Sequence, residues 1–306
     1  MIKGLILGGT GYLGFNIANS LSNSYSFTLT GRKPINHQLQ EFLDSKNITF
    51  NQAEIVKTRR IFELIDVNEL VIFCVPNTQP HQKRELFHSD IKRIITPARK
   101  IFQYICSQNK RVIFLSSGGS VYGPGGTTPH SEFSNPIPNT KYGQLKLILD
   151  NELLSLNQKF DLNHIVIRLS NPFGGTLDNL YKQGFINSLI RNIHSGKAIE
   201  LWGDGSQIRD FLFIEDFTGF VEKVLQFPNL GGVFNCGSGV GLSLNDVIQK
   251  ASEIIGYPIA VNFKGNYHEK IKSNILDVEK AKKVLNWYPK HEFDSIFKDL
   301  LLKRTH

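Results

Sequence analysis

The sequence predicts an α/β fold, in which helices cover both faces of a parallel, doubly wound sheet and a smaller lobe completes the C-terminal side. Short runs rich in β-branched residues and leucine alternate with longer stretches of helical spacing, the order expected of β-α-β units. Several runs are apolar throughout, as in strands that are covered on both faces. The predicted strands are residues 2–7, 26–30, 48–51, 70–75, 111–116, 164–169 and 233–236.

The alternation of strand and helix ends near Asn171, and this change sets the expected domain boundaries. Residues 1–171 and 211–237 are expected to form the sheet domain, with helices that include residues 14–21 and 97–108. Residues 172–210 and 238–306 mix helix, loop and short strand. We therefore expect a smaller lobe built from two separated segments.

Two helices are predicted in the second of these segments. Residues 244–255 have helical spacing, and Ser243 is a suitable N-cap. A second helix over residues 281–285 would end before the sequence Asn-Trp-Tyr-Pro at residues 286–289.

Composition narrows the class of protein. The 306 residues are 41% hydrophobic and 20% charged, which favours a packed core over disorder. Net charge is +8, yet no long basic run supports nucleic-acid binding, and a mild positive field suits a phosphorylated substrate. The cysteines Cys74, Cys106 and Cys236 lie far apart and indicate neither a disulfide framework nor a metal site. Without a signal peptide or membrane-spanning run, we expect a cytoplasmic protein with no membrane partner.

A glycine-rich turn follows the first predicted strand and opens the first predicted helix. Gly8, Gly11 and Gly14 permit a tight turn, close approach of backbone to a pyrophosphate and close packing of helix on strand. The helix N-terminus favours negative charge. An ordinary turn is the alternative, but the position between strand and helix favours a dinucleotide cofactor. The candidate cofactor residues here are Gly8, Thr10, Gly11, Tyr12, Leu13 and Gly14.

The end of the second strand bears on the choice between NAD and NADP. An acid usually stands there to bind the adenosine ribose of NAD, but this chain has Gly31 followed by Arg32 and Lys33. A guanidinium pairs well with a 2′-phosphate, so the sequence favours NADP over NAD. The alternative is that both cations are surface charges of a loop before Pro34.

A tyrosine and a lysine stand four residues apart in a helical stretch, as Tyr142 and Lys146. On a helix they share one face and can point into one cleft. The pKa of a free tyrosine is about 10, and a nearby ammonium would lower it, so Tyr142 would become an acid or base near neutral pH. Ser117 or Ser120, at the end of an earlier strand, can hydrogen-bond a reacting oxygen. The alternatives are a surface helix and serines that only cap backbone groups.

With these motifs in order, the chain resembles the extended short-chain dehydrogenase/reductases, the NAD(P)-dependent nucleotide-sugar epimerase/dehydratase family. The resemblance implies a Rossmann-type sheet domain, a nucleotide-sugar-binding lobe and an active site between them. By this resemblance Tyr142 is the general acid/base and Lys146 its partner, which also binds the nicotinamide ribose. Further segments that carry the resemblance are residues 117–123, 168–174, 202–205, 209–211, 215–216, 276–277 and 285–289.

The resemblance also implies roles for residues outside the catalytic pair. Glu54 and Ile55 match the segment that touches adenine, and Asn171 matches a substrate contact near the diphosphate. Arg209 matches the arginine that grips the sugar-nucleotide diphosphate, with a structural salt bridge to Asp210 or Asp216 as the alternative.

Three departures from the family pattern stand out. The family often has a catalytic Ser or Thr where this chain has Gly118, so the hydroxyl must come from Ser117 or Ser120 or be dispensable. A later arginine of the diphosphate site is not evident, and Lys270 or Lys272 can stand in as a point charge. Asp90 lies near a position where asparagine is common.

The leading functional hypothesis is a UDP-hexose 4-epimerase similar to UDP-glucose 4-epimerase, acting in polysaccharide biosynthesis. The runner-up is an NADPH-dependent reductase of a 4-keto-6-deoxy nucleotide-sugar, and a hypothesis of another class is a non-catalytic NAD(P)-binding sensor or scaffold. By analogy with the family, the protein is expected to be a homodimer that pairs through helices near residues 97–108 and 142–156.

Overall fold

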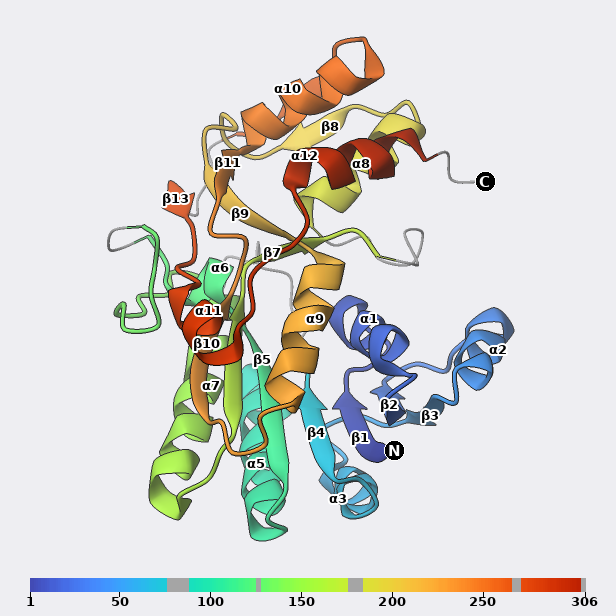
Figure 1. Cartoon of the computed structure of the whole chain (residues 1–306), viewed down its shortest axis with the longest axis vertical. Coiled ribbons are helices and arrows are strands. Elements are labelled where there is room, and N and C mark those ends of the chain that lie inside the picture. The colour runs from blue at the N-terminus through green and yellow to red at the C-terminus, as the bar shows by residue number, and fades with distance from the viewer. Residues whose placement is uncertain (76–87, 125–127, 176–183, 266–270, 304–306) are drawn as a thin grey trace.

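The computed structural model describes residues 1–75, 88–124, 128–175, 184–265 and 271–303 (Figure 1). Its largest sheet is seven-stranded and parallel throughout. In spatial order the strands are β10 (Gly232–Cys236), β6 (Ile165–Leu169), β5 (Arg111–Ser117), β4 (Leu70–Phe73), β1 (Ile2–Leu7), β2 (Tyr25–Gly31) and β3 (Thr49–Gln52). The strand order reverses between β1 and β4, the place where ligands bind in such sheets. The predicted parallel, doubly wound sheet is confirmed, although β4 ends at Phe73 rather than at residue 75.

Helices cover both faces of this sheet. Successive side chains of a strand point to opposite sides, and here both sets are apolar, so both faces need a cover. Ile6 of β1 packs into one core, whereas its neighbours Leu5 and Leu7 pack into the other. The first core is closed by α1 (Tyr12–Leu21), α2 (His37–Ser45), α9 (Ile214–Leu225) and α11 (Glu279–Leu285). The second is closed by α3 (Thr58–Asp66), α5 (Thr96–Ser107) and α7 (Lys141–Phe160), as Figure 1 shows.

Short helical segments lead into two of these elements. α4 (His88–Asp90) and a π-helix η1 (Ile91–Ile95) precede α5, and α6 (Gly118–Val121) follows β5 directly. The π-helix was not foreseen from the sequence. Such segments often occur near functional sites.

A smaller lobe with its own apolar core lies beyond the carboxyl ends of the strands (Figure 1). Its sheet has the order β11 (Gly241–Ser243), β9 (Ile208–Phe213) and β13 (Ser273–Asn274), with β7 (Asn171–Phe173) also on β9. β8 (Ile199–Leu201) pairs with β12 (Val261–Phe263). The helices of the lobe are α8 (Phe185–His194), α10 (Leu244–Ile255) and α12 (Phe293–Leu302).

The start of α10 agrees with the sequence-based expectation. The Ser243 side chain accepts from the Asp246 backbone N–H at 3.0 Å, and the Asp246 carboxylate accepts from the Ser243 N–H at 2.9 Å. This reciprocal capping box fixes the first turn. The predicted helix over residues 244–255 is confirmed.

The chain returns from the lobe to the sheet domain at its C-terminal side. Val278, Ala281, Leu285 and Trp287 pack with the first core of the sheet domain. The domain division expected from the sequence stays a prediction. The apolar contacts of α11 are with the core of the sheet domain, although the sequence assigned residues 238–306 to the lobe.

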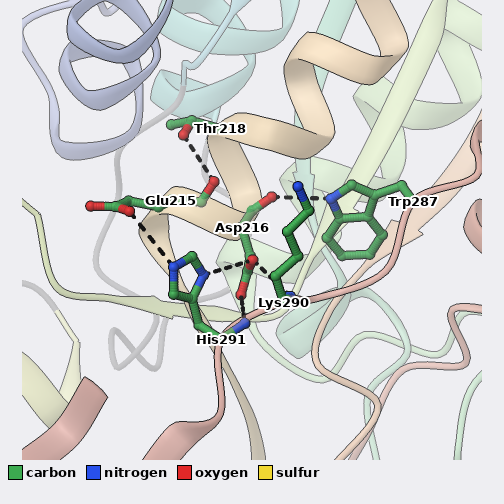
Figure 2. A network of polar contacts seen from close by, with 6 residues as sticks. All are labelled: Glu215, Asp216, Thr218, Trp287, Lys290 and His291. Carbon is green, nitrogen blue, oxygen red and sulfur yellow. Dashed lines mark hydrogen bonds and ion pairs between the residues drawn. The ribbon is translucent and has the colours of Figure 1, made fainter. Parts of the chain in front are cut away.

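A polar clip holds that returning segment to α9, as Figure 2 shows. The Asp216 carboxylate accepts from the backbone N–H groups of Lys290 (2.9 Å) and His291 (3.2 Å) and from the His291 ring Nδ1 (2.9 Å). The Trp287 indole N–H donates to the Asp216 carbonyl at 3.2 Å. Since Asp216 lies in the first turn of α9, the clip ties the chain that leads into α12 to the sheet domain.

Candidate active site

The glycine turn between β1 and α1 packs so closely that its glycines have no room for side chains. Gly8 adopts φ of +80°, which favours glycine. A Cβ on Gly14 would lie 2.7 Å from the Gly9 Cα and 3.0 Å from the Gly8 carbonyl, so only glycine lets helix and turn meet this closely. The first turn of α1, which follows the N-cap Gly11, carries no acidic residue. The positive end of the helix dipole is therefore not offset by a negative side chain in this turn.

The other candidates in this turn have side chains that are engaged within the protein. Tyr12 is buried, and its hydroxyl donates to the Gly174 carbonyl at 2.7 Å. Leu13 packs against the first core. Any part that Tyr12 and Leu13 play in holding a cofactor would come from their backbone.

At the end of β2, an acid of the kind that usually binds the adenosine ribose would require Thr10 to move. A side chain at Gly31 would collide with Thr10. Arg32 and Lys33 follow on the surface, both exposed. At the end of β3, Glu54 and Ile55 are partly buried, and Ile55 packs against the second core. The predicted adenosine contacts thus all follow the ends of β2 and β3, which are neighbouring strands.

Tyr142, Lys146 and Ser117 meet where β5 ends. The Lys146 ammonium lies 5.6 Å from the centre of the Tyr142 ring and donates to the Leu115 carbonyl at 2.6 Å. A hydrogen bond joins the Tyr142 phenol to the Ser117 side chain and favours the phenolate. Ser117 precedes α6 but makes no side-chain capping bond. The alternative of a mere capping serine therefore does not describe Ser117.

The expectation that Lys146 lowers the pKa of Tyr142 is wrong for the protein groups by themselves. Burial raises the pKa of Tyr142 to about 12; the hydrogen bond from Ser117 opposes the rise and the Asp150 carboxylate adds to it. Burial also lowers the pKa of Lys146 to about 8. Desolvation disfavours each charged form more than the pair favours it. With only the protein's own groups, Tyr142 is a neutral phenol at pH 7.

The structure distinguishes the two candidate serines. Ser120 is buried in α6, and its carbonyl packs against Gly143 of α7 so closely that a side chain at Gly143 would collide with it. At Gly118, where the family often has Ser or Thr, a Cβ would lie 2.7 Å from a Leu276 side-chain carbon. Leu276 thus fills the space beside Gly118, and the hydroxyl that reaches Tyr142 belongs to Ser117.

Asn171 and Arg209 lie on the paired strands β7 and β9, on the lobe side of the same region. The Asn171 amide donates to the Asp210 carbonyl at 2.9 Å. The Arg209 guanidinium donates to the carbonyls of Ile208 (2.8 Å) and Ile271 (3.1 Å).

Asp210 and Asp216, the alternative salt-bridge partners of Arg209, bind other groups. The Asp210 carboxylate accepts from backbone groups of Ser238, Gly239 and Leu276, and Asp216 forms the clip of Figure 2. This leaves the salt-bridge alternative for Arg209 without support.

Three further residues singled out in the sequence are Lys270, Lys272 and Asp90. Lys272 is exposed just before β13, whereas Lys270 lies outside the described residues. Asp90 pairs with Lys141 at 2.6 Å, which ties the segment before η1 to the first turn of α7, next to Tyr142. Sequence reasoning missed this pair, and it also missed Asp150, although its spacing of four from Lys146 was a usable signal.

We searched the described part of the chain for a metal-binding group of side chains and for a membrane-spanning helix. Among those residues no group of three or more His, Cys, Asp or Glu side chains could hold a metal ion. Nor does any described helix have the length and apolar character needed to cross a bilayer.

Comparison with known proteins identifies the family. The chain is 24% identical over 292 residues to dTDP-4-dehydro-6-deoxyglucose reductase of Escherichia coli, which covers 93% of this chain and 92% of the relative. It is 22% identical over 315 residues to UDP-glucose 4-epimerase of Lactobacillus helveticus, covering 95% and 93%. The crystal structure of UDP-glucose 4-epimerase with UDP-glucose from Thermotoga maritima superposes with a TM-score of 0.87 at 23% identity, covering 98% and 97%.

The family model for the NAD dependent epimerase/dehydratase family matches residues 4–237, a span that includes the glycine turn, Tyr142, Lys146 and Arg209. The predicted membership in the extended short-chain dehydrogenase/reductases and the predicted enzymatic nature are confirmed. The chain belongs to the NAD dependent epimerase/dehydratase family.

Proposed function

We propose that the protein is a UDP-hexose 4-epimerase, which oxidises C4 of the sugar to a ketone and returns hydride to its opposite face. The observation that carries the proposal is the Tyr142 phenol, bonded to Ser117 with the Lys146 ammonium beside it, at the carboxyl edge of the sheet. Relatives named as UDP-glucose 4-epimerases span nearly the whole chain, which supports the same activity. A non-catalytic sensor would have no use for a phenol and a hydroxyl that are partly exposed beside a buried ammonium.

The residues at the edge of the sheet fit a nicotinamide dinucleotide. The glycine turn leaves space that any side chain would fill, and α1 offers its N-terminus to the pyrophosphate. Gly8, Thr10, Gly11 and Gly14, with the backbone of Tyr12 and Leu13, would hold it, and Glu54 and Ile55 would face the adenine. When bound in its oxidised form, the nicotinamide supplies a hydride acceptor and a positive charge that favours the phenolate of Tyr142.

The protein's own groups would move the proton. Tyr142 as phenolate takes the proton of the C4 hydroxyl while the hydride leaves C4, and it gives the proton back when the ketone is reduced. Ser117 orients the phenol and favours its ionised form. Lys146 holds positive charge beside the ring and is the candidate to bind the nicotinamide ribose.

The lobe would hold the diphosphate and the sugar. We propose that Arg209 bridges phosphate oxygens, as a guanidinium can, and that Asn171 contacts the substrate near the diphosphate. Lys272, exposed on the same lobe, would add a point charge. The proposed role of Lys270 rests on the sequence alone.

Turnover with a defined substrate tests the proposal. Purified protein incubated with UDP-glucose or with UDP-N-acetylglucosamine should form the C4 epimer, observed by proton NMR, without net consumption of cofactor. Native mass spectrometry should show a nicotinamide dinucleotide carried through purification. Absence of either epimer from a panel of UDP-hexoses, with cofactor bound, would overturn the assignment.

A reductase of 4-keto-6-deoxy nucleotide-sugars is the second candidate, and the end of β2 favours it. Gly31 supplies no ribose-binding acid, and Arg32 and Lys33 suit a 2′-phosphate, so we propose NADP as the preferred cofactor. The Escherichia coli relative is named as a reductase of this kind. Stoichiometric loss of NADPH absorbance with such a ketone would identify the reductase. Arg32→Ala should reduce NADP affinity about tenfold and leave NAD affinity unchanged.

We also propose a homodimer that forms through α5 and α7. These helices lie side by side on one face of the sheet (Figure 1), and Leu147, Ile148 and Leu154 of α7 are only partly buried in the single chain. Light scattering coupled to gel filtration should give twice the chain mass for the wild type, and the mass of a single chain for Ile148→Glu.

We also propose that the protein works in the cytoplasm, because its three free cysteines suit a reducing compartment.

A further inference from the structure

A third charged residue continues the face of α7 that carries Tyr142 and Lys146. Asp150 follows Lys146 by four residues, the spacing that places side chains one turn apart on the same side of a helix. The relative exposures of Lys146 and Asp150 are 2% and 0%. The buried side of α7 thus holds a phenol, an ammonium and a carboxylate in sequence.

The carboxylate of Asp150 is fixed from the opposite side by Arg168 of β6. The Arg168 Nε donates to Asp150 Oδ2 at 3.1 Å, and Arg168 is itself 4% exposed. Its guanidinium also lies 5.0 Å from the centre of the Tyr122 ring, and the Tyr122 hydroxyl donates to Asn235 at 2.7 Å. These contacts reach from α7 through β6 to β10, so Asp150 has little freedom to move.

The charges around Lys146 decide whether its side chain is protonated. Burial disfavours the Lys146 ammonium, while the negative form of Cys74 after β4 and the Asp150 carboxylate favour it. Cys74 stays a neutral thiol at pH 7, since burial raises its pKa to about 12. That leaves the Asp150 carboxylate as the negative charge that favours the Lys146 ammonium; burial raises the pKa of Asp150, and the Arg168 guanidinium opposes that rise.

We propose that Asp150, held in place by Arg168, is a positioning residue that keeps the Lys146 ammonium charged and directed at the Tyr142 ring and the Leu115 carbonyl. The inference rests on the catalytic role proposed for Lys146. Asp150 also favours the protonated phenol of Tyr142, so it acts on both members of the pair in the same direction. Loss of its charge should therefore move both titrations to lower pH.

The test is a titration of Lys146 by NMR of protein labelled with ¹³C at the lysine ε carbon, with the resonance assigned by its loss in Lys146→Met. Asp150→Asn should lower the Lys146 midpoint by roughly one pH unit. Asp150→Glu, which keeps the charge, should restore it. The pH profile of kcat for Asp150→Asn should move as a whole to lower pH, because both limbs shift together.

A purely structural ion pair would give another result. In that case Asp150→Asn would lower stability and the height of the profile, while the Lys146 midpoint and the position of the profile stayed where they were. Such an outcome would overturn the inference. If Asp150→Asn does not fold because Arg168 is left buried without a partner, Asp150→Asn with Arg168→Gln removes both charges and should still lower the Lys146 midpoint, by less, because loss of the Arg168 cation favours the ammonium.

The titration separates this inference from the proposed function. The Lys146 midpoint needs no substrate, so a wrong sugar or nucleotide would leave the NMR result intact. An unchanged midpoint in a folded variant would refute the role of Asp150 even if the protein proves to be an epimerase.

Discussion

Two clusters of titratable groups, each with one buried member, lie at opposite edges of the same sheet, and one of the two has the form of an active site. At the carboxyl edge, Ser117 bonds to Tyr142, with Lys146 nearby. At the amino edge, the Cys106 thiol lies 3.1 Å from the Nε2 of His164. Both clusters pair a potential nucleophile or acid with a potential base, and burial shifts the pKa values in both.

The two clusters differ in whether their polar atoms already form hydrogen bonds that prevent proton transfer. The Val112 backbone N–H donates to the His164 Nδ1 at 3.3 Å, so the proton of the neutral ring is on Nε2 and is directed at Cys106. His164 therefore cannot accept the thiol proton. Burial lowers the pKa of His164 to about 4 and raises that of Cys106 to about 11, which keeps both groups neutral.

Arg111 completes the amino-edge cluster and is equally committed. Its guanidinium donates to the carbonyls of Asn163, Val224 and Leu230, so it cannot turn toward Cys106. At the carboxyl edge, by contrast, the phenol lies at the end of the sheet where the glycine turn follows β1 and beyond which the lobe lies. A shifted pKa marks both edges, and the surroundings decide which edge can react.

The largest effect should come from removing the proposed acid/base at the carboxyl edge. Tyr142→Phe keeps the ring that Lys146 contacts but removes the proton, and kcat should fall about a thousandfold, within the range for general acid/base catalysis. Cofactor affinity, followed by quenching of protein fluorescence, should change little. Tyr104→Phe is the matched control, because its hydroxyl donates to Asp66 near the amino edge. Wild-type turnover by Tyr142→Phe would remove Tyr142 from the mechanism.

The next effect concerns stability and belongs to the amino edge. The pKa of His164 is lower in the folded chain, so its full contribution is present above pH 6.5 and is lost as pH falls from there through about 4. At pH 5 this costs about 2 kcal/mol relative to pH 7.5. His164→Asn removes the titration and keeps an acceptor for the Val112 N–H. Urea unfolding at the two pH values should show a smaller difference for the variant, and an equal difference would contradict the assignment.

The contrast between the edges also shows what the sequence could reveal. The parallel sheet was predictable because its strands are apolar throughout, and the glycine turn was predictable because its spacing follows from sterics that act within a few residues. Tyr142 and Lys146 were readable for the same reason, since helical spacing is local. The capping box at Ser243 is another local pattern.

What could not be predicted depends on residues distant in the chain. The choice of Ser117 over Ser120 follows from the hydrogen bond between Ser117 and Tyr142, and the space beside Gly118 is filled by Leu276 from the far end of the sequence. The raised pKa of Tyr142 follows from burial, which no single motif encodes. The pair Cys106 and His164 joins residues whose separation in sequence carries no pattern, and the partners of Arg209 were likewise set by tertiary packing.

A smaller effect should separate the two serines. Ser117→Ala removes the hydrogen bond that favours the Tyr142 phenolate, so the pKa of Tyr142 should rise further and kcat at neutral pH should fall about tenfold. The pH profile should move toward alkaline pH. Ser120→Ala, buried in the adjacent α6, should alter kcat less and leave the position of the profile unchanged. An equal loss in both variants would contradict the choice of Ser117.

The smallest effect on kcat is expected from changing Cys106, the acidic group of the amino-edge cluster. Cys106→Ala removes the thiol that faces His164, yet kcat should stay within about twofold of wild type, because neither group can exchange a proton near neutral pH. Thiol labelling with a maleimide should likewise find Cys106 slow to react until urea unfolds the chain. A large loss of turnover together with normal stability would mean that the amino edge takes part in the reaction, and the division between a reactive edge and a structural edge would fail.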